Sequence, residues 1–140
     1  MPKPFRLLMI DDNENDAEMA TRALRDYTIP CELVYAREGA SALERLNTPG
    51  EPVPSLILLD LSMPKMDGLE FLEQVKANPR LRPIPVVMFT SSESPAQIRQ
   101  CYARYASCYI VKPFDGKEFT KVLRDLVNFW THFAILPEVA

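Results

Sequence analysis

The chain has 140 residues, which is enough for one domain with its own core and too short for two ordinary domains. Hydrophobic residues make up 47% and charged residues 25%, an ordinary globular mixture that argues against a disordered or fibrous protein. The net charge of −3 does not indicate a protein that binds nucleic acid or an anionic membrane. The apolar run 7–10 is too short for a secretion signal or a membrane span, so we expect a cytoplasmic protein.

Five short apolar segments bounded by turn residues predict five β-strands. They are Arg6–Ile10, Cys31–Ala36, Ser55–Leu59, Ile84–Phe89 and Cys108–Val111. Four of them are nearly continuous in apolar residues, which is typical of strands that are buried on both faces. The second contains Glu32, so we place it at an edge of the sheet.

Helical spacing of apolar residues separates these strands. It predicts five helices, marked by Ala17 to Tyr27, Ala42 to Leu46, Phe71 to Val75, Ile98 to Tyr105 and Phe119 to Trp130. Asp67 and Asp115 are expected to cap the third and fifth helices, and the run from Ser94 to Gln97 predicts a capping box for the fourth. Because strand and helix alternate five times, we expect an α/β domain with a parallel sheet between helices.

The carboxyl ends of the predicted strands carry the polar residues that bear on function. Asp11 and Asp12 follow the first strand, Asp60 follows the third, Thr90 follows the fourth and Lys112 follows the fifth. In an open parallel sheet these ends meet at one edge, where ligands bind. Clustered carboxylates need a cation beside them, which Lys112 and a divalent ion such as Mg²⁺ would supply. A carboxylate there can be the nucleophile for a phosphoryl group, although acids at strand ends also cap helices.

Other chemistries lack their residues in this sequence. The four glycines are dispersed, so neither a dinucleotide-binding loop nor a nucleoside triphosphate loop is expected. His132 is the only histidine and follows the fifth helix, where a surface position is expected. Cys31, Cys101 and Cys108 show no metal-binding spacing, so we expect free thiols packed as small apolar side chains.

Taken in order, these motifs resemble a response regulator receiver domain of two-component signalling. The resemblance rests on Asp11-Asp12, on the segment from Leu59 to Gly68, on Thr90-Ser91-Ser92 and on the segment from Val111 to Phe114. It covers about residues 5–130 and implies a flavodoxin-like, doubly wound sheet of five parallel strands in the order 2-1-3-4-5, with five helices. A single receiver domain is then expected over residues 1–140, with a C-terminal tail at 131–140.

The resemblance also implies an acceptor and a metal site. Asp60 would accept a phosphoryl group from a histidine kinase, so the chain would be a signalling switch rather than an enzyme. The implied ligands of Mg²⁺ are the carboxylates of Asp11, Asp12 and Asp60 and the backbone carbonyl of Ser62. The side chain of Ser62 occupies a position that varies in the family and affects how fast the acyl phosphate hydrolyses.

The resemblance further implies which residues respond to phosphorylation. Thr90 and Lys112 would bind the phosphoryl group, and the Lys112-Pro113 peptide bond would be cis. Tyr109 would be the aromatic switch residue, whose ring turns inward when Thr90 moves toward the phosphate. The surface of the fourth helix, fifth strand and fifth helix would then change shape as the active population grows.

More narrowly, the chain resembles the small regulators that partner phytochrome-type kinases. This resemblance rests on the run from Asp11 to Asp16, on the proline-rich loop before the third strand and on Phe129-Trp130 with Pro137. The apolar tail residues are Phe129, Trp130, Phe133, Ile135 and Leu136. They exceed what one helix stripe buries, so we expect a homodimer that also uses Tyr102 or Tyr105. The alternative is a tail that folds back over its own core.

Two other functions remain open from the sequence. One is an enzyme of flavodoxin-like fold, either flavin-binding or an aspartate-nucleophile phosphatase. Asp11 and Asp12 would repel a flavin phosphate, and Ser62 stands where such phosphatases usually have a second aspartate. The other is a degenerate receiver used only for docking, against which the intact set of acids, Thr90 and Lys112 argues.

Overall fold

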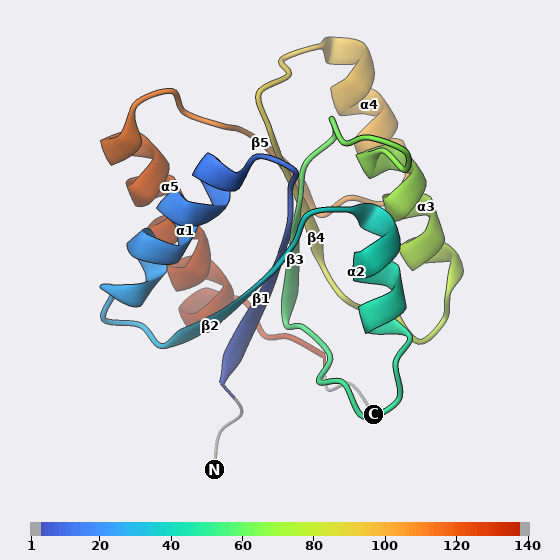
Figure 1. Cartoon of the computed structure of the whole chain (residues 1–140), viewed down its shortest axis with the longest axis horizontal. Coiled ribbons are helices and arrows are strands. Elements are labelled where there is room, and N and C mark those ends of the chain that lie inside the picture. Colours follow the sequence, from blue (N-terminus) through green and yellow to red (C-terminus); the bar gives the residue numbers. More distant parts are fainter. Residues whose placement is uncertain (1–3, 138–140) are drawn as a thin grey trace.

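The computed structural model describes residues 4–137, and in it one five-stranded sheet lies between two layers of helices (Figure 1). The strands are β1 (Phe5–Ile10), β2 (Cys31–Ala36), β3 (Leu56–Leu59), β4 (Val86–Thr90) and β5 (Cys108–Val111). The helices are α1 (Glu14–Arg25), α2 (Gly39–Leu46), α3 (Gly68–Ala77), α4 (Pro95–Ala103) and α5 (Gly116–Asn128). All pairings are parallel, in the order β2-β1-β3-β4-β5, so the predicted fold class and strand order are confirmed.

Each face of the sheet has its own helices and its own apolar core. Helices α1 and α5 cover one face, and α2, α3 and α4 cover the other (Figure 1). Alternate residues of β1 serve the two cores: Leu8 and Ile10 pack toward α2 and α3, whereas Leu7 and Met9 pack toward α1 and α5. The strands are therefore buried from both sides, which leaves their carboxyl ends as the place for polar chemistry.

Position in the sheet explains how deeply each strand is buried. Every residue of β3 and β4 is buried, as the apolar runs predicted. The predicted edge position of β2 is confirmed. The expectation that the fifth strand is buried on both faces is wrong, because β5 forms the other edge and is only half-buried along its length. Among residues 4–137, no helix is both long enough and apolar enough to cross a bilayer.

The predicted helix caps hold, with one change at α4. Asp67 Oδ1 accepts a hydrogen bond from the N–H of Glu70 at 2.9 Å at the start of α3. Ser94 Oγ accepts one from the N–H of Gln97 at 3.3 Å. The expected return contact from the Gln97 side chain to the Ser94 N–H is absent, because that side chain accepts a hydrogen bond from the Ser92 hydroxyl instead. The capping box is therefore only half formed.

The C-terminal ends of two helices differ from the apolar pattern. Tyr105 lies beyond α4 with φ of 70°, a left-handed conformation that cannot continue a helix. Helix α5 gives way to a π-helical turn over Phe129–Phe133, which carries Trp130. Trp130 and Leu136 pack on the core beside α1 and α5, so part of the tail folds back. Residues 138–140 of the predicted tail lie outside the described residues.

Candidate functional site

Three of the predicted site residues follow directly after strands, and the sheet holds their backbones. The N–H of Asp11 donates to a carbonyl of β2 at 3.1 Å, and the N–H of Asp60 donates to a carbonyl of β1 at 3.0 Å. The N–H of Lys112 donates to a carbonyl of β4 at 2.8 Å. These bonds continue the sheet ladder by one residue, so the three side chains start from fixed points at the carboxyl ends of the strands.

Three carboxylates at this edge form a group that one cation can bridge. Asp11, Asp12 and Asp60 each offer an oxygen, and these oxygens lie within 4.8 Å of one another. Asp11 and Asp60 are buried, whereas Asp12 is exposed. Burial raises the pKa of Asp11 from 3.8 to about 6, and the nearby Lys112 ammonium opposes that rise. The site thus gathers more negative charge than Lys112 alone can neutralise.

The donor set fits a hard divalent ion. All three side chains offer oxygen, which is the ligand type that Mg²⁺ prefers, together with retained waters. Asp11 Oδ2 is buried and accepts no aligned hydrogen bond, although it touches the Lys112 ammonium. The geometry therefore matches the divalent-metal site expected from the sequence.

Lys112 is the buried cation of the site. Its Nζ lies 2.6 Å from Asp11 Oδ2, 2.8 Å from Asp16 Oδ2 and 3.5 Å from Asp60 Oδ2. The contact with Asp16 is an aligned hydrogen bond, whereas the contacts with Asp11 and Asp60 are ion pairs. Burial on its own would lower the pKa of Lys112, but the Asp11 and Asp16 carboxylates outweigh it and hold that pKa above its usual value. Lys112 therefore carries its charge at neutral pH.

Asp16 is a site residue that the sequence analysis missed. It lies in the first turn of α1, where its backbone N–H donates to the side chain of the capping residue Asn13 at 3.1 Å. Its side chain is only 15% exposed, because this turn faces the end of the sheet. A signal was present in the sequence. Asp16 stands four residues before the fully buried Ala20, and side chains at that spacing share a helix face.

The two predicted switch residues lie on the neighbouring strands β4 and β5. Thr90 is buried at the end of β4. The Tyr109 hydroxyl donates to the carbonyl of Ser92, two residues after Thr90, at 2.8 Å. The backbone N–H of Tyr109 donates to the Tyr102 hydroxyl of α4 at 3.2 Å. Burial raises the pKa of Tyr109, which therefore stays a neutral donor to Ser92. The Tyr109 ring is thus hydrogen-bonded to the chain segment that follows Thr90.

The loop after β3 depends on a close approach at Gly68. The N–H of Gly68 donates to the carbonyl of Leu61 at 2.9 Å. A Cβ at Gly68 would overlap the carbonyl oxygen of Asp60 and would lie 2.8 Å from the Cα of Leu61. Only glycine lets α3 begin this close to the Asp60 backbone. Ser62 lies on the same loop and is exposed, and the role of its carbonyl as a metal ligand stays a prediction.

The expectation of a cis Lys112-Pro113 bond is wrong. None of the peptide bonds in residues 4–137 is cis, this one included. The trans form is favoured by about 0.5–1 kcal/mol before any proline in the absence of a constraint that selects cis. Here Lys112 already reaches Asp11, Asp16 and Asp60 with the trans bond, so the side-chain contacts require no cis geometry.

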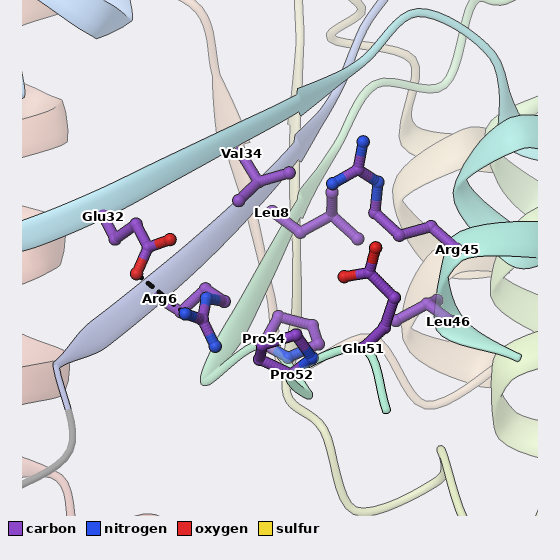
Figure 2. A pocket seen from close by; sticks show the side chains of 9 residues that line it. All are labelled: Arg6, Leu8, Glu32, Val34, Arg45, Leu46, Glu51, Pro52 and Pro54. Atoms are coloured by element: carbon purple, nitrogen blue, oxygen red, sulfur yellow. Dashed lines mark hydrogen bonds and ion pairs between the residues drawn. The ribbon is translucent and has the colours of Figure 1, made fainter. Parts of the chain in front are cut away.

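A small cavity elsewhere in the chain is a weaker candidate for the functional site. It measures about 100 Å³ and lies beside the starts of β1 and β2 (Figure 2), whereas the acids follow the carboxyl ends of the strands. Arg6 and Glu32 form an ion pair of 2.8 Å on one wall, and Arg45 and Glu51 lie on another (Figure 2). Two positive and two negative side chains leave its lining without net charge.

The predicted surface position of His132 and the free thiols of Cys31, Cys101 and Cys108 are also confirmed.

Comparison with known proteins agrees with this geometry. Residues 7–124 match the response regulator receiver domain family. Response regulator Rcp1 of Synechocystis sp. is 36% identical over 138 residues, which cover 96% of this chain and 94% of that protein. The crystal structure of the phosphorylated cyanobacterial phytochrome response regulator RcpA superposes with a TM-score of 0.91 and 34% identity, covering 97% of this chain and 100% of that one.

A second crystal structure bears on the metal site. The Mn²⁺-bound form of response regulator Rcp1 superposes with a TM-score of 0.88 and 35% identity, covering 96% of this chain and 100% of that one. Receiver domains bind a divalent metal ion in an acidic pocket, and the three carboxylates described above form such a pocket. The chain belongs to the response regulator receiver family, whose members are signalling switches, and it is close to the phytochrome response regulators.

Proposed function

We propose that this chain is a phosphoacceptor switch in which Asp60 takes a phosphoryl group from a histidine kinase. One observation carries the proposal. The Asp60 carboxylate lies 3.5 Å from the buried Lys112 ammonium and within 4.8 Å of two further carboxylates that can share a divalent ion with it. In the transfer, an Asp60 oxygen bonds to phosphorus while the phosphorus–nitrogen bond of the kinase phosphohistidine breaks and its electron pair returns to the ring. The product is an acyl phosphate.

The proposed ligands of Mg²⁺ are the carboxylates of Asp11, Asp12 and Asp60 and the backbone carbonyl of Ser62. When bound, the ion would neutralise charge on the phosphoryl oxygens during transfer. Asp11 brings the buried Oδ2 oxygen that accepts no aligned hydrogen bond, and Asp12 is open to solvent, where an ion can enter. Lys112 supplies a positive charge 3.5 Å from the Asp60 carboxylate.

Thr90 and Tyr109 form the proposed switch. Once Asp60 is phosphorylated, the Thr90 hydroxyl and the Lys112 ammonium bind phosphoryl oxygens and favour the active arrangement of the chain. The movement of Thr90 pulls on Ser92, whose carbonyl holds the Tyr109 hydroxyl at 2.8 Å. The movement of Thr90 toward the phosphate also leaves room for the half-buried Tyr109 ring to turn further inward. The surface formed by α4, β5 and α5 changes as a result, and this surface carries the output.

The proposed phosphoryl donor is a phytochrome-type histidine kinase in the cytoplasm. Support comes from the relatives: RcpA is a cyanobacterial phytochrome response regulator, and it matches 97% of this chain. The whole length of 1–140 is proposed to be one receiver domain. Phosphotransfer from a purified phytochrome-type kinase that is faster than transfer from an unrelated histidine kinase supports this pairing, and equal or slower transfer contradicts it.

We also propose a homodimer that uses the α4-β5-α5 surface and the tail. Phe129, Phe133 and Ile135 are 50%, 72% and 97% exposed, although Trp130 and Leu136 pack on the core. Exposed aromatic side chains in a cluster are typical of an interface. Sedimentation of the wild type should show a dimer that Phe133→Ser weakens. Monomer alone at high micromolar concentration removes the proposal.

The test of the acceptor is a mass measurement. The protein is incubated with a small phosphodonor such as acetyl phosphate and Mg²⁺, and its intact mass is followed. The wild type should gain one phosphoryl group, and Asp60→Asn or a chelator should abolish the gain. Asp115→Asn is the matched control, because Asp115 is an exposed cap of α5 outside the site. A gain that persists in Asp60→Asn contradicts the proposal.

A further inference from the structure

We propose that Asp16 is a positioning residue that holds the Lys112 ammonium away from Asp60 and so keeps the Asp60 carboxylate open to a divalent ion and a phosphoryl donor. The inference rests on the proposed function, because it takes Asp60 as the acceptor and as a metal ligand. It adds a fourth carboxylate to the site, whose role is to position the Lys112 ammonium rather than to bind the ion.

The contacts of Lys112 divide its carboxylate partners into two kinds. Asp11 and Asp60 belong to the group of acids whose oxygens can share one ion. Asp16 does not belong to that group, yet it receives the aligned hydrogen bond of the Lys112 ammonium at 2.8 Å. Asp60 is the most distant of the three partners, at 3.5 Å. Lys112 thus touches Asp11 at 2.6 Å but donates its aligned hydrogen bond to Asp16, a carboxylate that the ion does not need.

Without the charge of Asp16, Lys112 would move toward Asp60. The ammonium has three protons and needs three acceptors, and the buried carboxylates beside it are those of Asp11, Asp16 and Asp60. If Asp16 no longer attracts it, a small shift brings Nζ from 3.5 Å into hydrogen-bond distance of Asp60 Oδ2. There the ammonium competes with a divalent ion for the same oxygen, since both neutralise the same charge.

Asp16 is placed firmly enough to act in this way. Its backbone N–H is held by the Asn13 side chain at 3.1 Å, and its carboxylate lies at the N-terminal end of α1, where the helix dipole favours negative charge. The side chain is 15% exposed, so solvent screens its attraction for Lys112 only in part. Neither the cap nor the helix end depends on Lys112, so the Asp16 backbone stays in place when the ammonium moves.

Calorimetric titration with MgCl₂ tests the inference on the whole chain. The conservative variant is Asp16→Asn, which keeps the size of the side chain and leaves the backbone bond to Asn13 in place. We expect its Mg²⁺ dissociation constant to rise by about fivefold or more, the scale of coupling within one charged network. Glu14→Gln is the matched control. It removes a charge from the same helical turn, but Glu14 pairs with exposed Arg37 at 2.9 Å, so less than about a twofold change is expected.

A second comparison separates positioning from simple loss of charge. In a Lys112→Met background, Asp16→Asn should weaken Mg²⁺ binding much less than it does in the wild type, because the residue through which Asp16 acts is gone. In phosphorylation by acetyl phosphate, Asp16→Asn should raise the Mg²⁺ concentration for half-maximal rate and leave the rate at saturating Mg²⁺ nearly unchanged. Circular dichroism confirms that each variant is folded before it is titrated.

Each outcome has one meaning. Equal Mg²⁺ affinity of the wild type and Asp16→Asn overturns the positioning role and leaves the proposed function standing. An equal loss with and without Lys112 also overturns it, because the effect is then only that of a missing charge. A wild type that binds no Mg²⁺ overturns the proposed metal site, and the positioning role with it.

Discussion

Replacement of Gly68 by alanine should disrupt the loop that carries the proposed acceptor. The added Cβ would overlap the carbonyl oxygen of Asp60 and would lie 2.8 Å from the Cα of Leu61. Both obstacles are backbone atoms, which cannot rotate away as a flexible side chain can. Helix α3 must therefore move outward, which strains the bond of 2.9 Å from the Gly68 N–H to the Leu61 carbonyl. Overpacking of this kind costs about 3 kcal/mol of unfolding free energy.

Urea unfolding followed by circular dichroism measures this cost. Gly116→Ala is the matched control, because Gly116 begins α5 and nothing lies within 4 Å of its added Cβ. That variant should be more stable than the wild type by about 0.5 kcal/mol, since alanine restricts the unfolded chain. Gly68→Ala should also be phosphorylated more slowly by a small phosphodonor. A Gly68→Ala protein within about 1 kcal/mol of the wild type would refute the close approach at this loop.

Three further predictions concern the charges and the switch. Burial raises the pKa of Asp11 from 3.8 to about 6, so the folded chain binds a proton that the unfolded chain lacks between these values. The unfolding free energy of the wild type should therefore fall as the pH rises through this window. Asp11→Asn lacks this titration, so in urea titrations its stability relative to the wild type should increase from about pH 4 to about pH 7. Lys112→Ala leaves the buried Asp11 carboxylate without its cation, so the unfolding free energy at neutral pH should fall by about 3 kcal/mol in the same assay. An unchanged urea midpoint would contradict the buried ion pair between Lys112 and Asp11. Tyr109→Phe removes the bond to the Ser92 carbonyl and should lose about 1 kcal/mol, a loss that would be absent if the hydroxyl faced solvent.

The sequence predicted the centre of the site because of a rule about parallel sheets. Asp11, Asp60 and Lys112 each follow a strand, and the carboxyl ends of parallel strands share one edge. Their convergence needed only the correct strand boundaries and the family's strand order. The apolar runs supplied the boundaries to within one or two residues, since buried strands in this fold are nearly free of polar side chains.

Features that depend on tertiary contacts were not predicted. Asp16 was missed because its role depends on how α1 is oriented toward the end of β5, which the Asn13 cap helps to fix. Apolar spacing alone placed Tyr105 in α4, but the positive φ of this residue ends the helix. The tail illustrates the same limit. Its apolar residues all looked alike in sequence, yet Leu136 packs on the core while Phe133 stays exposed.

Asp60 is the proposed site of the acyl phosphate. Identifying which carboxylate carries that phosphoryl group is the most direct test of this assignment. The protein is treated with acetyl phosphate and Mg²⁺, the acyl phosphate is reduced with borohydride, and the resulting homoserine is located by peptide sequencing in a mass spectrometer. We expect homoserine at position 60 and at no other carboxylate. Homoserine at Asp11, Asp12 or Asp16, or at none of the acids, would contradict it.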